Sequence, residues 1–93
     1  MRLTVRFYGV AFDKTGEHEW KPELKPDSTV LGLLDVIVEK FPSLNELVYD
    51  ETRMPLEYLS ISVNNRDILG LNGVNTRLCE DDIVFIMPPI GGG

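Results

Sequence analysis

The most apolar run of the chain, Ile83–Met87, is followed at once by Pro88 and Pro89. A strand without alternating polar positions is typical of the centre of a sheet, where both faces are buried. Proline has no N–H to give to a sheet ladder, so the strand is expected to end there. The last three residues of the sequence are glycines. We therefore predict one folded body, residues 1–87, that carries a flexible tail, residues 88–93.

The length and composition of the chain indicate one small globular domain. Single domains commonly hold about 100–150 residues, and this chain has 93, of which 43% are hydrophobic and 26% charged. No apolar stretch approaches the roughly 20 residues that a membrane helix needs. The first residues alternate like a strand and do not follow the pattern of a signal peptide. We expect a cytoplasmic protein with no membrane partner.

The chain is acidic, with a net charge of −6 from nine basic and fifteen acidic residues. Residues 42–93 account for −5 of this net charge. An acidic surface repels phosphate backbones and anionic lipids, which argues against nucleic acid and membranes as partners. The charge favours a partner with a basic cleft, although solubility alone explains it equally well.

The chain has one cysteine, Cys79, and one histidine, His18. These numbers exclude an internal disulfide and leave too few side chains for the usual zinc site or Cys–His nucleophilic pair. We interpret Cys79 as a small, partly buried apolar residue and His18 as an ordinary residue of an edge strand. We expect a protein that is not itself an enzyme and that holds no metal and no permanently bound cofactor.

The first part of the chain predicts two strands. Arg2–Tyr8 alternates between apolar and polar residues and is expected to be a half-buried strand. Gly9–Gly16 is expected to be a loop. Glu17–Leu24 alternates again, and Pro22 places this second strand at a sheet edge. The apolar residues of the first strand are expected in the core: Leu3, Val5 and Phe7.

A helix is expected to run from a cap at Ser28 or Thr29 to about Phe41. Pro42 disfavours helical geometry at the residue before it and so ends the helix. Apolar residues recur on one face of this helix, at Val30, Leu33, Leu34, Ile37 and Phe41. Such a face predicts that the helix packs on a sheet.

Short elements are expected between the helix and the final strand. Ser43–Tyr49 reads as a short second helix and Asp50–Pro55 as an exposed excursion. Leu59–Val63 alternates as a strand, Asn64–Asn65 suits a tight turn, and Arg66–Leu69 returns from that turn.

The resulting order is strand, strand, helix, short strands and final strand. A hairpin with a helix across it and a last strand inserted in the middle, parallel to the first, is the β-grasp arrangement. We therefore predict an α+β fold with a mixed sheet and one main helix on one face. The other face is expected to present Thr4, Arg6 and Tyr8 to solvent or to a partner.

Four segments are informative together: Thr29–Leu34, Phe41–Pro42, Val63–Arg66 and Asp82–Gly93. They resemble the ubiquitin-like sulfur carriers of the MoaD/ThiS family, and most of all the branch of the molybdopterin synthase small subunit. The resemblance covers nearly the whole chain except Tyr49–Tyr58, a stretch that makes the chain longer than the thiamine-pathway carriers. Two features depart from the family pattern, namely a glycine at Gly91 and the glycine-free turn Glu80–Asp82.

The resemblance implies that sulfur is carried on the end of the chain. A ubiquitin-activating-like adenylyltransferase would use ATP to activate the Gly93 carboxylate, and a sulfur donor protein would turn it into a thiocarboxylate. The large subunit of molybdopterin synthase would then use this sulfur to build the dithiolene of molybdopterin. Because glycine has no Cβ, Gly92 and Gly93 can pass through a narrow tunnel and leave the terminal carbonyl open to attack.

The tail is not expected to hold a partner by itself. Ordering Ile90–Gly93 costs about 4–8 kcal/mol at about 1–2 kcal/mol per residue, whereas each hydrogen bond returns only about 1 kcal/mol net. The folded body must therefore dock as well. The residues expected to bind the partner are Arg6, Tyr8, Met87, Pro88, Pro89, Ile90 and Gly91.

Two other functions fit the same sequence. The activated carboxylate can instead be joined to a lysine amine of a target, as in ubiquitin and the small archaeal modifiers, because the tail chemistry is identical. The chain can also be read as a passive β-grasp binding module whose tail has no role. The agreement between the apolar strand, the prolines and the glycines favours a working tail over the passive module.

Overall fold

The computed structural model describes residues 1–56 and 59–87 of the chain. The expected tail, residues 88–93, lies outside the described residues. Within the described part, a five-stranded sheet has the order β2-β1-β5-β3-β4. The strands are β1 (Thr4–Phe7), β2 (Glu19–Trp20), β3 (Ser60–Val63), β4 (Arg66–Asp67) and β5 (Ile83–Met87).

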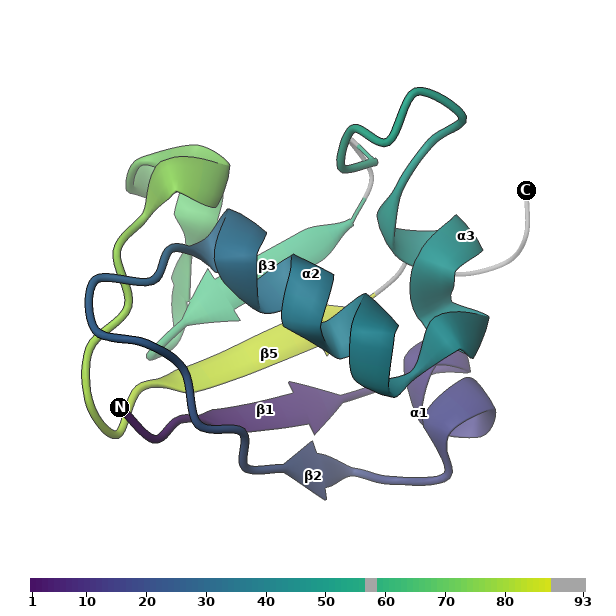
Figure 1. Ribbon diagram of the computed structural model, residues 1–93, viewed down its shortest axis with the longest axis horizontal. Helices are drawn as coiled ribbons and strands as arrows, with labels where there is room; N and C mark the ends of the chain where they lie inside the picture. The colour runs from purple at the N-terminus through teal and green to yellow at the C-terminus, as the bar shows by residue number, and fades with distance from the viewer. Residues whose placement is uncertain (57–58, 88–93) are drawn as a thin grey trace.

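Strand β5 lies in the centre of the sheet (Figure 1). It runs parallel to β1, with Val84 opposite Val5, and antiparallel to β3, with Ile86 opposite Ile61. The short strands β2 and β4 form the two edges. The predicted mixed sheet, with its final strand inserted in the middle, is therefore confirmed.

Helix α2 (Val30–Lys40) crosses one face of the sheet (Figure 1). Its cap is Thr29, whose Oγ1 accepts a hydrogen bond from the Gly32 N–H at 3.3 Å. The helix ends two residues before Pro42, as predicted. Its fully buried residues form the centre of the core together with the inward side chains of the sheet: Val30, Leu33, Leu34 and Ile37.

In the described residues, five short helical elements complete the fold: α1 (Val10–Thr15), η1 (Pro42–Leu44), α3 (Asn45–Val48), η2 (Ile68–Gly70) and η3 (Gly73–Asn75). The expected second helix corresponds to η1 and α3. Residues 50–54 are exposed, as the sequence predicts.

The prediction of a loop between the first two strands was wrong, because this connection contains helix α1. The side chain of Ala11 is fully buried there. The hydroxyl of Thr15 donates to the carbonyl oxygen of Ala11 at 2.9 Å, and Gly16 ends the helix in the left-handed region with φ of 72°. This short helix lets the connection bury one apolar residue, Ala11, while the charged residues Asp13 and Lys14 face water.

The second strand is shorter than expected, since only Glu19–Trp20 of the predicted stretch forms regular β structure. The chain still follows β1 beyond it. The N–H of Leu3 donates to the Pro22 carbonyl oxygen at 3.2 Å, and the N–H of Leu24 donates to that of Met1 at 2.8 Å. Proline interrupts the regular ladder, and the predicted edge position is confirmed.

Strand β5 is not buried on both faces, which corrects the expectation from its composition. Val84 and Ile86 are 0% and 1% exposed, but Ile83 and Met87 are 36% and 42% exposed, and Phe85 is half-buried. Helix α2 covers only one face, so the alternate residues of this strand face outward. These apolar residues are consequently unusual for a half-exposed strand.

The predicted turn at Asn64–Asn65 is confirmed, with φ of 51° and 69° at the two residues. Cys79 is exposed, contrary to the expectation that it is partly buried. His18 is also exposed, and its ring stacks on Phe12 with the ring centroids 3.8 Å apart. Among the described residues, no helix is both long enough and apolar enough to cross a membrane.

Candidate functional site

The face of the sheet opposite α2, here called the open face, is built from alternate residues of three strands. Phe85 of β5 pairs with Arg6 of β1 and with Ser62 of β3, so these three side chains share one side of the sheet. The same alternation gives the residues that the three central strands contribute to the open face: Thr4, Arg6, Tyr8, Ser60, Ser62, Ile83, Phe85 and Met87.

An aromatic and cationic cluster occupies the middle of the open face. The rings of Tyr8 and Phe85 meet edge to face, with centroids 5.4 Å apart and an interplanar angle of 66°. The guanidinium carbon of Arg6 lies 5.7 Å from the centroid of the Phe85 ring. Phe85 is therefore covered by a ring on one side and a cation on another, an arrangement that stabilises both neighbours.

The end of β5 adjoins this cluster. Met87 pairs with Ser60 of β3, and the N–H of Tyr8 donates to the carbonyl oxygen of Ile86 at 3.3 Å. The hydrogen-bonded ladder between β1 and β5 thus continues to Ile86, the last residue but one of β5. The described part of the chain ends one residue after the Ile86 carbonyl that binds Tyr8.

The structure brings together three residues that the sequence predicts as partner contacts, namely Arg6, Tyr8 and Met87. Their role in binding stays a prediction. The other predicted site residues lie outside the described part of the chain: Pro88, Pro89, Ile90, Gly91, Gly92 and Gly93. Phe7, which the sequence assigns to the core, is fully buried.

Phe85 is the site residue that sequence reasoning missed. The uniform apolarity of Ile83–Met87 suggested burial on both faces, so none of its residues except Met87 was assigned to a surface. The signal was already in the sequence, because a single main helix covers only one face of a sheet. Once one face is open, every second residue of the strand must lie on it.

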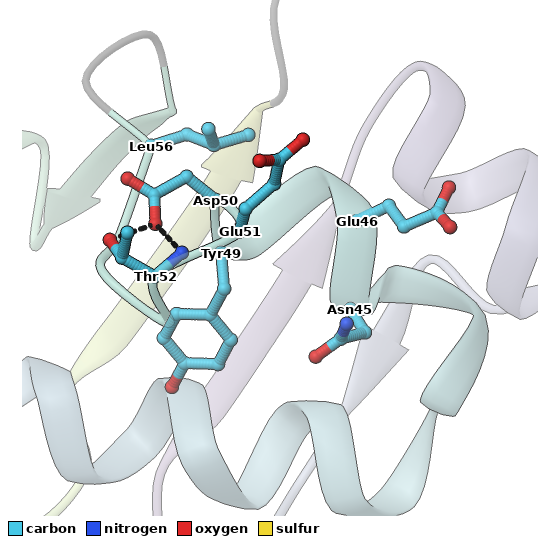
Figure 2. Close-up of a pocket in the computed structure, with 7 residues that line it drawn as sticks. All are labelled: Asn45, Glu46, Tyr49, Asp50, Glu51, Thr52 and Leu56. Atoms are coloured by element: carbon cyan, nitrogen blue, oxygen red, sulfur yellow. Dashed lines mark hydrogen bonds between the residues drawn. The ribbon is translucent and has the colours of Figure 1, made fainter.

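A separate open hollow of about 680 Å³ lies beside α3 (Figure 2). Its lining is mostly polar and acidic: Asn45, Glu46, Tyr49, Asp50, Glu51, Thr52 and Leu56. Asp50 Oδ1 accepts hydrogen bonds from the Thr52 hydroxyl at 2.6 Å and from the Thr52 N–H at 2.8 Å. The bonds from Thr52 and from the Met54 N–H lower the pKa of Asp50, which here shapes a turn.

The Tyr49 ring on the floor of this hollow points toward α2 (Figure 2). Its hydroxyl donates a hydrogen bond to Asp35 on that helix. Burial of the phenol, the hydrogen bond to Asp35 and the negative charge of Asp35 together raise the pKa of Tyr49 far above its ordinary value, while Arg53 opposes them. Through this hydrogen bond, the neutral phenol of Tyr49 connects the start of the exposed segment, residues 50–54, to helix α2.

A model of the ThiS family matches residues 5–93, nearly the whole chain. The chain belongs to the ThiS family. This is a family of small ubiquitin-like carrier and modifier proteins that are generally not catalytic themselves. The resemblance predicted from the sequence is confirmed.

The ThiS-family chain is 27% identical over 94 residues to small archaeal modifier protein 3 of Haloferax volcanii, covering 100% of both chains. The structure of SAMP1 from Haloferax volcanii has a TM-score of 0.90 at 17% identity, again covering 100% of both chains. The putative molybdopterin converting factor, subunit 1, from Pyrococcus furiosus has a TM-score of 0.76 at 24% identity, over 96% of this chain and 98% of that one. These structures confirm the β-grasp fold.

Proposed function

We propose that this ThiS-family chain is a sulfur carrier. Its Gly93 carboxylate is activated, converted to a thiocarboxylate and used as the sulfur source for the dithiolene of molybdopterin, with the chain acting as the small subunit of molybdopterin synthase. The family match, which includes the glycine end, supports the carrier role. The name of the structurally similar Pyrococcus furiosus protein supports the molybdopterin branch.

The observation that carries the proposal is where β5 ends. The central strand brings Met87 to the open face, one residue after the Ile86 carbonyl that accepts the Tyr8 N–H, and the glycine-ended segment follows directly in the sequence. Six residues span up to about 20 Å when extended. A partner that holds the open face can therefore receive Gly93 in an active site some distance away.

The chemistry needs partners because a carboxylate is a poor electrophile. The carboxylate of Gly93 attacks the α-phosphate of ATP on an adenylyltransferase, which releases pyrophosphate and forms an acyl-adenylate. A persulfide sulfur of the donor protein then attacks the acyl carbon and AMP leaves. A thiol cleaves the resulting S–S bond, supplies two electrons and frees the thiocarboxylate. This chain contributes the acyl group and the docking surface.

The test is the intact mass of the chain after incubation with the adenylyltransferase of its source organism, ATP and a persulfide donor. The expected result is the exchange of one terminal oxygen for sulfur. Removing Gly92 and Gly93 together should abolish this mass change and leave the melting temperature unchanged. Retention of sulfur transfer by that truncated chain would rule the proposal out.

A matched control comes from the three terminal glycines. Deleting a single glycine shortens the chain by one residue but leaves a Gly-Gly end. If the diglycine is the feature that the partner needs, this variant still gains sulfur. Comparing the two deletions thus shows whether the partner requires a terminal Gly-Gly pair or the full length of the tail.

A second function, conjugation to lysine amines of target proteins, is favoured by the full-length similarity to small archaeal modifier protein 3. In that reaction an amine replaces the persulfide, AMP leaves and an isopeptide bond forms. Conjugates in cell extract that disappear when Gly92 and Gly93 are deleted would support it. Since both reactions share the acyl-adenylate, the two roles are compatible.

A further inference from the structure

Arg6 stands in a row of paired residues that runs across the open face. Its neighbour on one side is Glu19 of β2, and its neighbour on the other is Phe85 of β5. The adjacent carboxylate would be the natural partner for the guanidinium. It is instead paired with Lys21, whose Nζ lies 3.7 Å from Glu19 Oε1.

Arg6 is left with an unsatisfied hydrogen-bond donor. Its Nε is buried and has no hydrogen-bond partner among residues 1–56 and 59–87. Within residues 1–56 and 59–87, the ion pairs are Arg2–Glu23, Lys21–Glu19 and Arg77–Asp27, so Arg6 takes part in none. A buried N–H without an acceptor costs free energy, and such a group in a native fold calls for an explanation.

The surroundings of Arg6 select the kind of acceptor. Phe85 lies beneath the guanidinium, and the exposed side chains of Ile83 and Met87 belong to the same face. A partner that covers these apolar groups removes water from Arg6 as well. In a water-poor contact, a carboxylate is the group that matches the planar N–H fork of arginine.

We propose that Arg6 binds a carboxylate of the adenylyltransferase when the open face docks, so that an acidic side chain ringed by apolar ones is the partner's matching patch. The inference rests on the proposed function, which supplies this partner. It also separates two charge effects. The net charge of −6 favours a generally basic partner at long range, whereas Arg6 requires one acid at the centre of the contact.

The test is the affinity of the adenylyltransferase of the source organism for purified full-length chain, without ATP. Replacing Arg6→Met keeps the unbranched apolar stem and removes the N–H donors. We expect Kd to rise about 10–100-fold, mainly through faster dissociation, because central arginines and desolvated charge pairs act on the off-rate. Arg6→Lys should recover only part of the affinity, since lysine lacks the fork.

The matched control is Arg2→Met, which removes an exposed arginine whose only side-chain hydrogen bond or ion pair in the described part is with Glu23 at 3.3 Å. Its Kd should stay within about twofold of wild type. The melting temperature of Arg6→Met should stay close to that of wild type, because the lost cation–π contact with Phe85 is offset by the removal of an unsatisfied donor. A fall in melting temperature that accompanies the loss of affinity would assign Arg6 a structural role and overturn the inference.

A charge exchange identifies the acceptor. Arg6→Glu should bind worse than Arg6→Met, and one Asp→Arg or Glu→Arg change on the docking surface of the enzyme should restore its binding. If Arg6→Met binds like wild type while wild type still gains sulfur, the inference is wrong and the proposed function stands. If wild type neither binds nor gains sulfur, the proposed function fails and this inference fails with it.

Discussion

Asn64 and Asp82 are joined by a hydrogen bond of 2.8 Å from Asn64 Nδ2 to Asp82 Oδ1. The other oxygen of the buried carboxylate accepts the N–H of Cys79 at 2.7 Å. Asn64 Oδ1 in turn accepts the N–H of Ile83 at 2.9 Å. The turn after β3 is thereby tied to the first residue of β5, which fixes where the central strand enters the sheet.

Replacing Asn64→Ala should lower the free energy of unfolding more than Asn65→Ala does. Both residues have positive φ, of 51° and 69°, so both changes carry a similar backbone cost. Only Asn64 bonds Asp82 and Ile83 through its side chain. The difference between the variants in urea denaturation should be about 1–3 kcal/mol, because the buried carboxylate loses a donor. Equal losses would contradict the role given to Asn64.

The two isoleucines of β5 offer a test of the two faces. Ile86 is 1% exposed and Ile83 is 36% exposed. Ile86→Ala should cost about 2–5 kcal/mol of stability through lost burial and the cavity that it leaves. Ile83→Ala should cost less than about 1 kcal/mol, since its side chain is already partly in water. Similar losses in chemical denaturation would show that the open face is covered in the free chain.

Helix α2 contains one glycine, Gly32, at which a substitution should stabilise the protein. A Cβ built on Gly32 meets its nearest atom, Thr29 Oγ1, at 3.9 Å, which is ordinary contact. Gly32→Ala should therefore raise the free energy of unfolding by about 0.5–1 kcal/mol. Gly73 also has open space around it, but its φ is 58°. Gly73→Ala should lower stability by about 1–2 kcal/mol, so calorimetry of the two variants should give shifts of opposite sign.

Stability should fall at alkaline pH because of Tyr49. Burial and then Asp35 raise the pKa of this phenol above its ordinary value of 10.0, so the folded chain holds the proton more tightly than the unfolded chain does. The resulting stabilisation is complete below that value and is lost as the pH rises above it. Tyr49→Phe should show a shallower decline of melting temperature above pH 10. An identical decline would contradict the coupling to Asp35.

The elements that the sequence predicts correctly are those with a local signal. The helix is specified by apolar spacing, by a cap at Thr29 and by the stop at Pro42. The turn at Asn64–Asn65 is specified by residues that tolerate positive φ. The central place of β5 follows from its apolarity. In each case, the residues that define the element are adjacent in sequence, so no tertiary information is needed.

The predictions that were wrong all concern burial, that is, which side chains are covered by other parts of the fold. Helix α1 is too short to have a clear period, and it forms because Ala11 finds a place in the core. Cys79 is exposed because it begins a turn, in which the N–H of Cys79 donates to the Asp82 carboxylate. Phe85 lies on the open face because no second helical layer exists among the described residues. Burial of this kind depends on the assembled layers, which a single sequence pattern does not contain.

Strand β5 is held on both sides, by four residue pairs with β1 and by four with β3. A pull on its carboxyl end acts along these two ladders, so their hydrogen bonds must shear together and cannot open one at a time. A load shared in this way is mechanically strong. A protein-unfolding ATPase that pulls on the carboxyl end of this protein should therefore meet the greatest mechanical resistance in the first unfolding step.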